Sequence, residues 1–185
     1  MKKATSLKSD LNIYFLVYRC QVGDELAFRQ LYEQFYSRSL RLLRGLLKYE
    51  EAEDLNQEVW LTVYKRIAGL DDAARFRTWL FQITRNKALD HFRKAKRFNE
   101  FHEILRNEEE PIIDADLEIE QNTSKELEHY LGKLSPKLRE PLMLHVFEGM
   151  DYEEMALILG LSIGTVKSRI HNAKRKIKRL KNEQD

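Results

Sequence analysis

Residues 151–181 read DYEEMALILGLSIGTVKSRIHNAKRKIKRLK, and this stretch decides the fold of the second half of the chain. Apolar residues recur in its last part at alternating steps of three and four, the spacing of one helix face: Ile163, Val166, Ile170, Ala173, Ile177 and Leu180. The other faces carry eight basic residues and no acid: Lys167, Arg169, Lys174, Arg175, Lys176, Lys178, Arg179 and Lys181. Such a helix is suited to bind phosphate.

The residues before this helix predict a helix-turn-helix. Ala156 is a small residue where two helices touch, Gly160 is a turn residue that tolerates positive φ, and Val166 is a buried anchor on the second helix. Asp151 and Ser162 are good N-caps for the two helices. The second half of the chain is therefore predicted to bind DNA.

Composition places the chain among soluble helical proteins. It has 185 residues, of which 43% are hydrophobic and 34% charged, and it lacks the alternating runs and tight turns of β-strands. The predicted fold class is all-α, with two small helical domains. No run of the sequence resembles a membrane span or a signal peptide, and the single Cys20 excludes an internal disulfide. We expect a cytoplasmic protein.

Charge divides the chain into three parts. The formal net charge is only +2, but residues 100–128 contain eleven acids and two bases. This segment therefore carries minus nine, which leaves plus eleven on the rest. The segment also has little periodicity and contains Pro111, as expected of a linker between two basic domains.

Helix signals flank this segment on both sides. A first helix is predicted to begin near Asp24, a second around Glu51, and a third after a break at residues 69–74. Beyond the acidic segment, Ser135 and Pro136 have the order of an N-cap and a first helical residue. Gly149, Gly160 and the caps described above then delimit the remaining helices: residues 136–148, 152–159 and 163–181.

Three stretches carry a resemblance to one family. EAEDLNQEVW (residues 51–60) and FRTWLFQITRNKALDHFR (residues 76–93) resemble the second conserved region of bacterial sigma factors. Residues 134–181, with YEEMA at 152–156 and GTVKSR at 164–169, resemble their fourth region. Their order and spacing are similar to those of the extracytoplasmic-function group of the sigma-70 family. Both regions together are far more specific than a helix-turn-helix alone.

The resemblance implies an organisation and a function. Residues 1–20 would be an N-terminal extension, 21–97 region 2, 98–128 an acidic linker and 129–185 region 4. The protein would bind core RNA polymerase and direct promoter-specific transcription initiation, without being an enzyme. The implied partners are the clamp of the largest polymerase subunit, the flap of the second-largest subunit near residues 142–147, promoter DNA and an anti-sigma factor. No cofactor, metal or small-molecule substrate is expected.

One face of the second helix is a candidate docking surface. Asp54, Gln57, Glu58 and Leu61 follow one another at i, i+3, i+4 and i+7, offset from the apolar stripe that enters the core. The plain alternative for residues at this spacing is an acidic face that is simply exposed to solvent. The resemblance implies that this face binds the polymerase clamp.

The third helix carries residue types suited to hold an unpaired base. Aromatic faces, amides and arginines stack on and hydrogen-bond to such a base, which offsets the lost pairing. By the resemblance, the candidates for the minus-10 strand are Phe76, Arg77, Trp79, Asn86, Asp90 and Arg93. For Trp79, a core position beside Leu80 and Ile83 is an equal alternative.

Exposed residues at the start of a recognition helix contact base edges in a major groove. The candidates for the minus-35 element are Thr165, Lys167, Ser168, Arg169, His171, Asn172 and Arg175. The absence of acids argues against a merely solvating role for these charges, although His171 is also consistent with simple exposure.

Two other classes of function make different demands on the sequence. A helix-turn-helix transcriptional regulator would bind duplex DNA without core polymerase, and its first domain would sense a ligand or partner. Nothing in the sequence supports an enzymatic function, because it has neither a paired-histidine motif nor a glycine-rich phosphate loop. The carboxylates of Glu53, Asp54 and Glu58 have no histidine nearby to complete a metal site.

Overall fold

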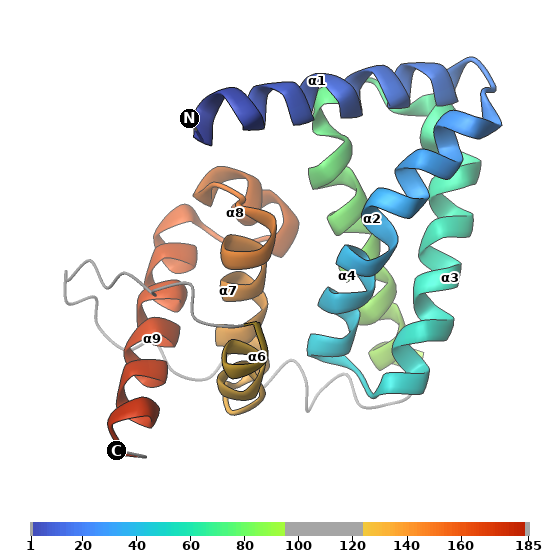
Figure 1. Ribbon diagram of the computed structural model, residues 1–185. Helices are drawn as coiled ribbons and strands as arrows, with labels where there is room; N and C mark the ends of the chain where they lie inside the picture. Colours follow the sequence, from blue (N-terminus) through green and yellow to red (C-terminus); the bar gives the residue numbers. More distant parts are fainter. Residues whose placement is uncertain (1, 95–123, 184–185) are drawn as a thin grey trace. The chain divides into compact units, whose positions relative to one another are not determined.

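The computed structural model describes residues 2–94 and 124–183, and all regular secondary structure within them is helical (Figure 1). The predicted all-α fold class is confirmed for these residues. The chain divides into two compact units, Met1–Ala88 and Leu89–Asp185. Most of the predicted linker lies outside the described residues, but its residues 124–128 belong to a helix, α6 (Ser124–Gly132).

The first unit is built around three long helices, the last of which continues past the boundary at Ala88. They are α2 (Glu25–Leu46), α3 (Tyr49–Arg66) and α4 (Phe76–Lys94), with short 3₁₀ helices η1 (Ile67–Gly69) and η2 (Ala73–Arg75) between the last two. Asp24 is the N-cap of α2, as predicted, and its side chain accepts hydrogen bonds from the backbone N–H groups of Leu26 and Ala27. The predicted break at residues 69–74 coincides with the two 3₁₀ turns.

Apolar side chains from the three helices form the core of this unit. Leu31 and Phe35 of α2, Val59 and Val63 of α3, and Leu80 of α4 are fully buried. Burying an aliphatic or aromatic side chain of this size contributes about 1.5 to 3 kcal/mol. Packing of the apolar stripes therefore accounts for the arrangement of these helices.

A helix that the sequence analysis did not predict precedes Asp24. Helix α1 (Lys2–Gln21) lies across the end of the unit where α2 begins, α3 ends and α4 begins (Figure 1). It packs through four buried residues at helical spacing: Ile13, Leu16, Val17 and Cys20. Burial raises the pKa of the Cys20 thiol to about 11, so this cysteine is structural.

The end of α1 holds the segment between α3 and α4. The side-chain amide of Gln21 donates a hydrogen bond to the carbonyl oxygen of Leu70 (2.7 Å). Two residues further on, the side chain of Asp72 caps η2 by accepting from the backbone N–H of Ala74 (2.9 Å). The loop before α4 is thus fixed from two sides.

A buried polar cluster connects α2 to α3. The hydroxyl of Ser39 donates to Asn56 Oδ1 (2.7 Å) and accepts from Trp60 Nε1 (3.1 Å), while Asn56 Nδ2 donates to the carbonyl oxygen of Tyr36 (3.2 Å). Ser39, Asn56 and Trp60 are all buried. Because these groups bond only in one alignment, they fix the register of α3 on α2.

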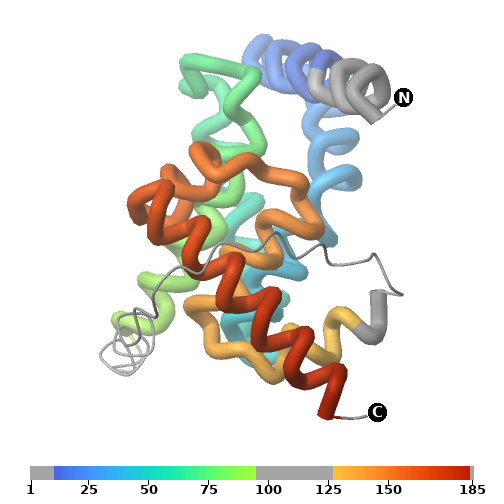
Figure 2. The backbone as a smooth tube through the Cα atoms, turned by 90° about the vertical axis from the view of Figure 1, so that its left-hand side faces the viewer, coloured from blue at the N-terminus to red at the C-terminus, as the bar shows by residue number. Residues whose placement is uncertain are grey.

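The second unit contains α6, α7 (Pro136–Glu148), α8 (Tyr152–Leu159) and α9 (Ile163–Asn182). Figure 2 shows α9 running along the unit, and α9 packs mainly on α7 and α8. Gly149 and Gly160 end α7 and α8 with φ of 61° and 63°, the left-handed conformation that glycine tolerates best.

The turn between α6 and α7 is held by Arg139. Its guanidinium donates to the carbonyl oxygens of Leu134 (2.7 Å) and Gly132 (3.1 Å), and burial lowers its pKa. Ser135 is the N-cap residue of α7, with Pro136 as the first helical residue, as predicted. Its hydroxyl, however, makes no capping hydrogen bond.

The Ser39 cluster predicts the cost of removing one hydroxyl. Ser39→Ala leaves Asn56 Oδ1 without its donor and the indole N–H of Trp60 without its acceptor. We expect the free energy of unfolding to fall by about 2 to 3 kcal/mol, measured by urea denaturation. Ser37→Ala on the exposed side of α2 is the control and should change it by less than about 0.5 kcal/mol. Equal effects would contradict the assigned role.

Candidate functional site

The predicted docking face is exposed on α3. Asp54, Gln57, Glu58 and Leu61 are all exposed, and 60% of the apolar Leu61 is accessible to solvent. The other face of α3 is buried in the core through Leu55, Val59 and Val63. The arrangement supplies an acidic surface with one exposed apolar side chain beside it, which suits a protein partner.

Ion pairs border this face without covering it. The ammonium of Lys87 on α4 lies 3.1 Å from Glu58 Oε2, and both side chains remain partly exposed. Such surface pairs contribute at most about 1 kcal/mol. On the neighbouring turn, Glu53 pairs with Arg44 (2.6 Å) and accepts from the hydroxyl of Tyr36 (3.1 Å). Glu53 therefore serves the packing of α2 on α3, whereas Asp54 faces outward.

The structure adds one exposed residue to the predicted docking face that the sequence analysis missed. Tyr64 is 56% exposed and follows Leu61 by three residues, so the two side chains are neighbours on the same surface. Its ring contacts Phe28 edge to face, with centroids 5.0 Å apart. The spacing of three from Leu61 was the signal that would have identified it.

The candidates for the minus-10 strand are divided by burial. Asn86, Asp90 and Arg93 are exposed on α4, where Asp90 and Arg93 form an ion pair. Arg77 and Trp79 are half-buried near the start of the helix. These five side chains stay available for contact with DNA, and their roles stay predictions.

Phe76 is the exception, and its assignment to base contact does not agree with the structure. Its side chain is 0% exposed and packs edge to face on Phe35 of α2, with ring centroids 5.4 Å apart. A ring buried in this way has no free face on which a base could stack. Phe76 is therefore a core residue that anchors the start of α4.

The helix-turn-helix prediction is confirmed in its geometry. A capping box begins α8, in which Asp151 accepts from the backbone N–H of Glu154 (2.8 Å) while Glu154 accepts from that of Asp151 (3.1 Å). Ser162 caps α9 by accepting from the backbone N–H of Thr165 (3.1 Å). Val166 is fully buried, as an anchor requires.

The minus-35 candidates lie along α9 with different degrees of exposure. Lys167 and Arg175 are exposed, and the others are half-buried: Thr165, Ser168, Arg169, His171 and Asn172. The ammonium of Lys167 lies 5.3 Å from the ring centre of Tyr152, which itself stacks on His145. The prediction that Ile163 belongs to the buried stripe was wrong, because it is 39% exposed in the first turn of α9.

The segment expected to hold the polymerase flap is only partly accessible. Leu142 and Leu144 are fully buried inside the second unit, whereas Val146 and Phe147 are half-buried. A flap that binds this segment would therefore contact Val146 and Phe147 and not Leu142 or Leu144.

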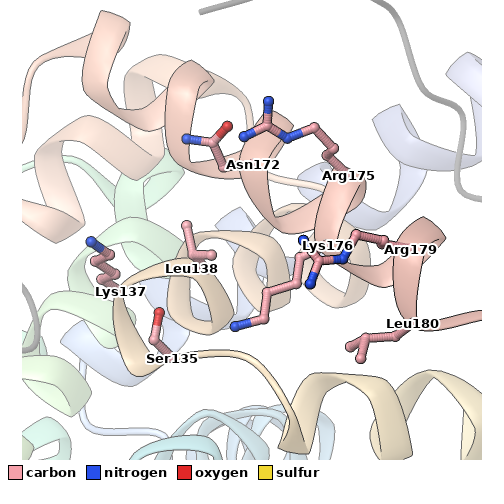
Figure 3. Close-up of a pocket in the computed structure, with 8 residues that line it drawn as sticks. All are labelled: Ser135, Lys137, Leu138, Asn172, Arg175, Lys176, Arg179 and Leu180. Atoms are coloured by element: carbon pink, nitrogen blue, oxygen red, sulfur yellow. The ribbon is translucent and has the colours of Figure 1, made fainter. Parts of the chain in front are cut away.

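A basic pocket in the second unit escaped the sequence analysis. It has a volume of about 520 Å³ and lies between the start of α7 and the later turns of α9 (Figure 3). Its lining consists of Ser135, Lys137, Leu138, Asn172, Arg175, Lys176, Arg179 and Leu180. Residues 135–138 come from far away in the sequence, so only the packing of α7 on α9 reveals them.

Within the described residues, no cluster of His, Cys, Asp and Glu side chains has the arrangement of a metal site. None of the helices described there combines the length and apolarity that crossing a membrane requires.

Comparison with known proteins identifies two matching regions. The family model described as Sigma-70 region 2 matches residues 31–98, and that of Sigma-70 region 4 matches residues 124–177. The ECF RNA polymerase sigma-E factor of Haemophilus influenzae is 29% identical over 172 residues, which cover 88% of this chain and 91% of the relative. The ECF RNA polymerase sigma factor EcfG of Rhodopseudomonas palustris is 33% identical over 136 residues, 71% of each chain.

A solved structure has a similar fold. The sigma factor RpoE of Bartonella quintana, crystallised with the anti-sigma factor NepR, superposes with a TM-score of 0.62 at 25% sequence identity. The match covers 84% of this chain and 96% of that one. The likeness therefore extends over both units.

The burial of Phe76 predicts a stability effect. Phe76→Leu removes ring atoms from a filled core and should lower the free energy of unfolding by about 1 to 2 kcal/mol, measured by urea denaturation. Tyr18→Leu is the control, because Tyr18 is exposed on α1 and should cost less than about 0.5 kcal/mol. If Phe76→Leu proved as mild as the control, Phe76 would again be a candidate for contact with DNA.

Proposed function

The chain belongs to the sigma-70 family, as a sigma factor of the extracytoplasmic-function group, and we propose how its residues divide the work of that function. A sigma factor binds core RNA polymerase and directs it to promoters. The observation that carries the assignment is the presence of both conserved regions, in the right order, on two separately packed helical units.

The first unit docks on polymerase and holds the opened strand. The acidic face of Asp54, Gln57 and Glu58, with the exposed Leu61 one turn later, binds the clamp of the largest subunit. Trp79 and Asn86 contact the minus-10 strand, with Arg77, Asp90 and Arg93 beside them. Support for this division comes from the geometry: Lys87, next to Asn86, pairs with Glu58, so the two surfaces adjoin.

The second unit reads the minus-35 element as a duplex. The start of α9 enters the major groove, where Lys167 and Arg169 favour guanine and Asn172 favours adenine. Thr165, Ser168, His171 and Arg175 complete the contacts. The flap of the second-largest polymerase subunit binds near the end of α7, at Val146 and Phe147.

Regulation by an anti-sigma factor follows from the same membership. The related RpoE of Bartonella quintana was crystallised with such a protein. An anti-sigma factor that covers the acidic face of α3 would keep this chain from polymerase. This chain acts in the cytoplasm, where polymerase and chromosome are found.

A helix-turn-helix regulator that acts without polymerase is not favoured. Such a protein has no use for the exposed acidic face of α3 or for a second conserved region. The two readings differ in one measurable property: a sigma factor gains promoter specificity from core polymerase, whereas a regulator binds its operator unaided.

Loss of one docking carboxylate should weaken assembly with polymerase. Asp54→Ala is expected to raise the dissociation constant for bacterial core polymerase about tenfold, because it removes an exposed charge from the docking face. Fluorescence anisotropy of the labelled full chain measures this constant. The control is Glu33→Ala, which removes the same charge from an exposed position on α2. An unchanged constant for Asp54→Ala would reject this face as the docking surface.

Loss of one recognition side chain should relax promoter choice. Arg169→Ala in the holoenzyme should reduce discrimination at one minus-35 base pair by about 1 to 3 kcal/mol. Lys178→Ala, nine residues later on α9, should lower affinity equally for all sequences. Binding to a library of randomised minus-35 elements, chosen around a promoter that the wild type transcribes, distinguishes the two. A wild-type preference profile in Arg169→Ala would contradict the assignment.

A further inference from the structure

The α7–α9 pocket has the electrostatics of an anion site. Its lining includes four cationic residues and no acid: Lys137, Arg175, Lys176 and Arg179. Figure 3 shows Lys176 and Arg179 extending from α9 opposite Ser135 and Lys137 at the start of α7. Arg179 pairs through Nε with Glu183 (3.2 Å), so an acid orients it from outside the lining. A phosphate group complements this arrangement of charge.

One polar side chain of the pocket does not cap its helix. The hydroxyl of Ser135 makes no capping bond although it occupies the N-cap of a thirteen-residue helix. A hydroxyl and a helix N-terminus both hydrogen-bond to phosphate oxygens.

Position along α9 separates Lys176 and Arg179 from the first turns of the helix, and Asn172 and Arg175 lie between the two. Lys176 and Arg179 follow Thr165 by eleven and fourteen residues, which corresponds to about 17 to 21 Å of helix. The major groove is only about 12 Å wide. When Thr165 lies at the bases, the later residues therefore lie beyond the groove edge, beside the sugar-phosphate backbone.

We propose that the α7–α9 pocket binds one backbone phosphate of the promoter duplex, just outside the groove that the first turns of α9 enter. This inference rests on the proposed function. Ser135 holds the phosphate from α7, and Lys176 and Arg179 hold it from α9, while Lys137, only 4% exposed, adds positive charge to the lining. The pocket thereby fixes the register in which Arg169 meets its base pair.

Neutralising single phosphates tests the pocket directly. Holoenzyme made from the full chain and core polymerase is titrated with promoter duplexes that each carry one uncharged methylphosphonate near the minus-35 element. For the wild type, we expect one backbone position, or two adjacent ones, at which affinity falls about tenfold. The Lys176→Ala holoenzyme should bind unmodified DNA about tenfold more weakly than the wild type does. A methylphosphonate at that backbone position should then weaken its binding no further. Ser135→Ala should lower the sensitivity without unfolding α7, because its hydroxyl makes no cap bond.

Lys178→Ala is the matched control, since it removes the same charge from the same helix but does not line the pocket. A methylphosphonate at the position that weakens wild-type binding should weaken the binding of Lys178→Ala by the same factor. Equal sensitivity in Lys176→Ala and Lys178→Ala would overturn the proposal. The proposal would also be overturned if Lys176→Ala bound DNA as the wild type does but bound an acidic anti-sigma peptide more weakly. Failure of the wild-type holoenzyme to prefer an unmodified promoter over random duplex would instead reject the proposed function, and the pocket's role with it.

Discussion

The buried hydrogen bonds among Ser39, Asn56 and Trp60 set the alignment of α3 on α2, and the first unit depends on them. An apolar interface alone tolerates small sliding, whereas polar groups without water must meet their partners. With this alignment, the stripe through Val59 is buried and the face through Asp54 is exposed. One cluster of three side chains thus decides which surface of the helix a partner meets.

The second unit obtains the same precision from its helix ends. The capping box at Asp151, the left-handed Gly160 and the cap at Ser162 follow one another within twelve residues. They determine where α8 stops and in which direction α9 starts. Val166 then anchors α9, and the basic side chains point away from the core. Local chemistry and packing agree here, which is why the helix-turn-helix is evident in the sequence.

Caps, turns and amphipathic stripes are local, and the sequence therefore predicted most of the helices from Asp24 onward and most of their buried faces. Helix α6 is the exception, since its first residues were predicted to belong to the linker. Long-range packing was not predictable in this way. Helix α1 is apolar on several sides, so its stripe through Ile13 and Val17 gave no clear period. The burial of Phe76 depends on Phe35, forty-one positions away, and the α7–α9 pocket likewise joins distant segments. Aromatic and basic residues were assigned to DNA by type, and only packing separates those that remain accessible.

The central claim is that this chain opens promoters together with core polymerase, with one unit docked on the enzyme and the other on upstream duplex. Permanganate reactivity of thymines in a promoter fragment tests it directly, because only unpaired thymines react. We predict reactive thymines in the minus-10 element when both the chain and core polymerase are present, and none with either alone. Sequence-specific protection of duplex DNA by the chain alone, with no opening when polymerase is added, would contradict the account.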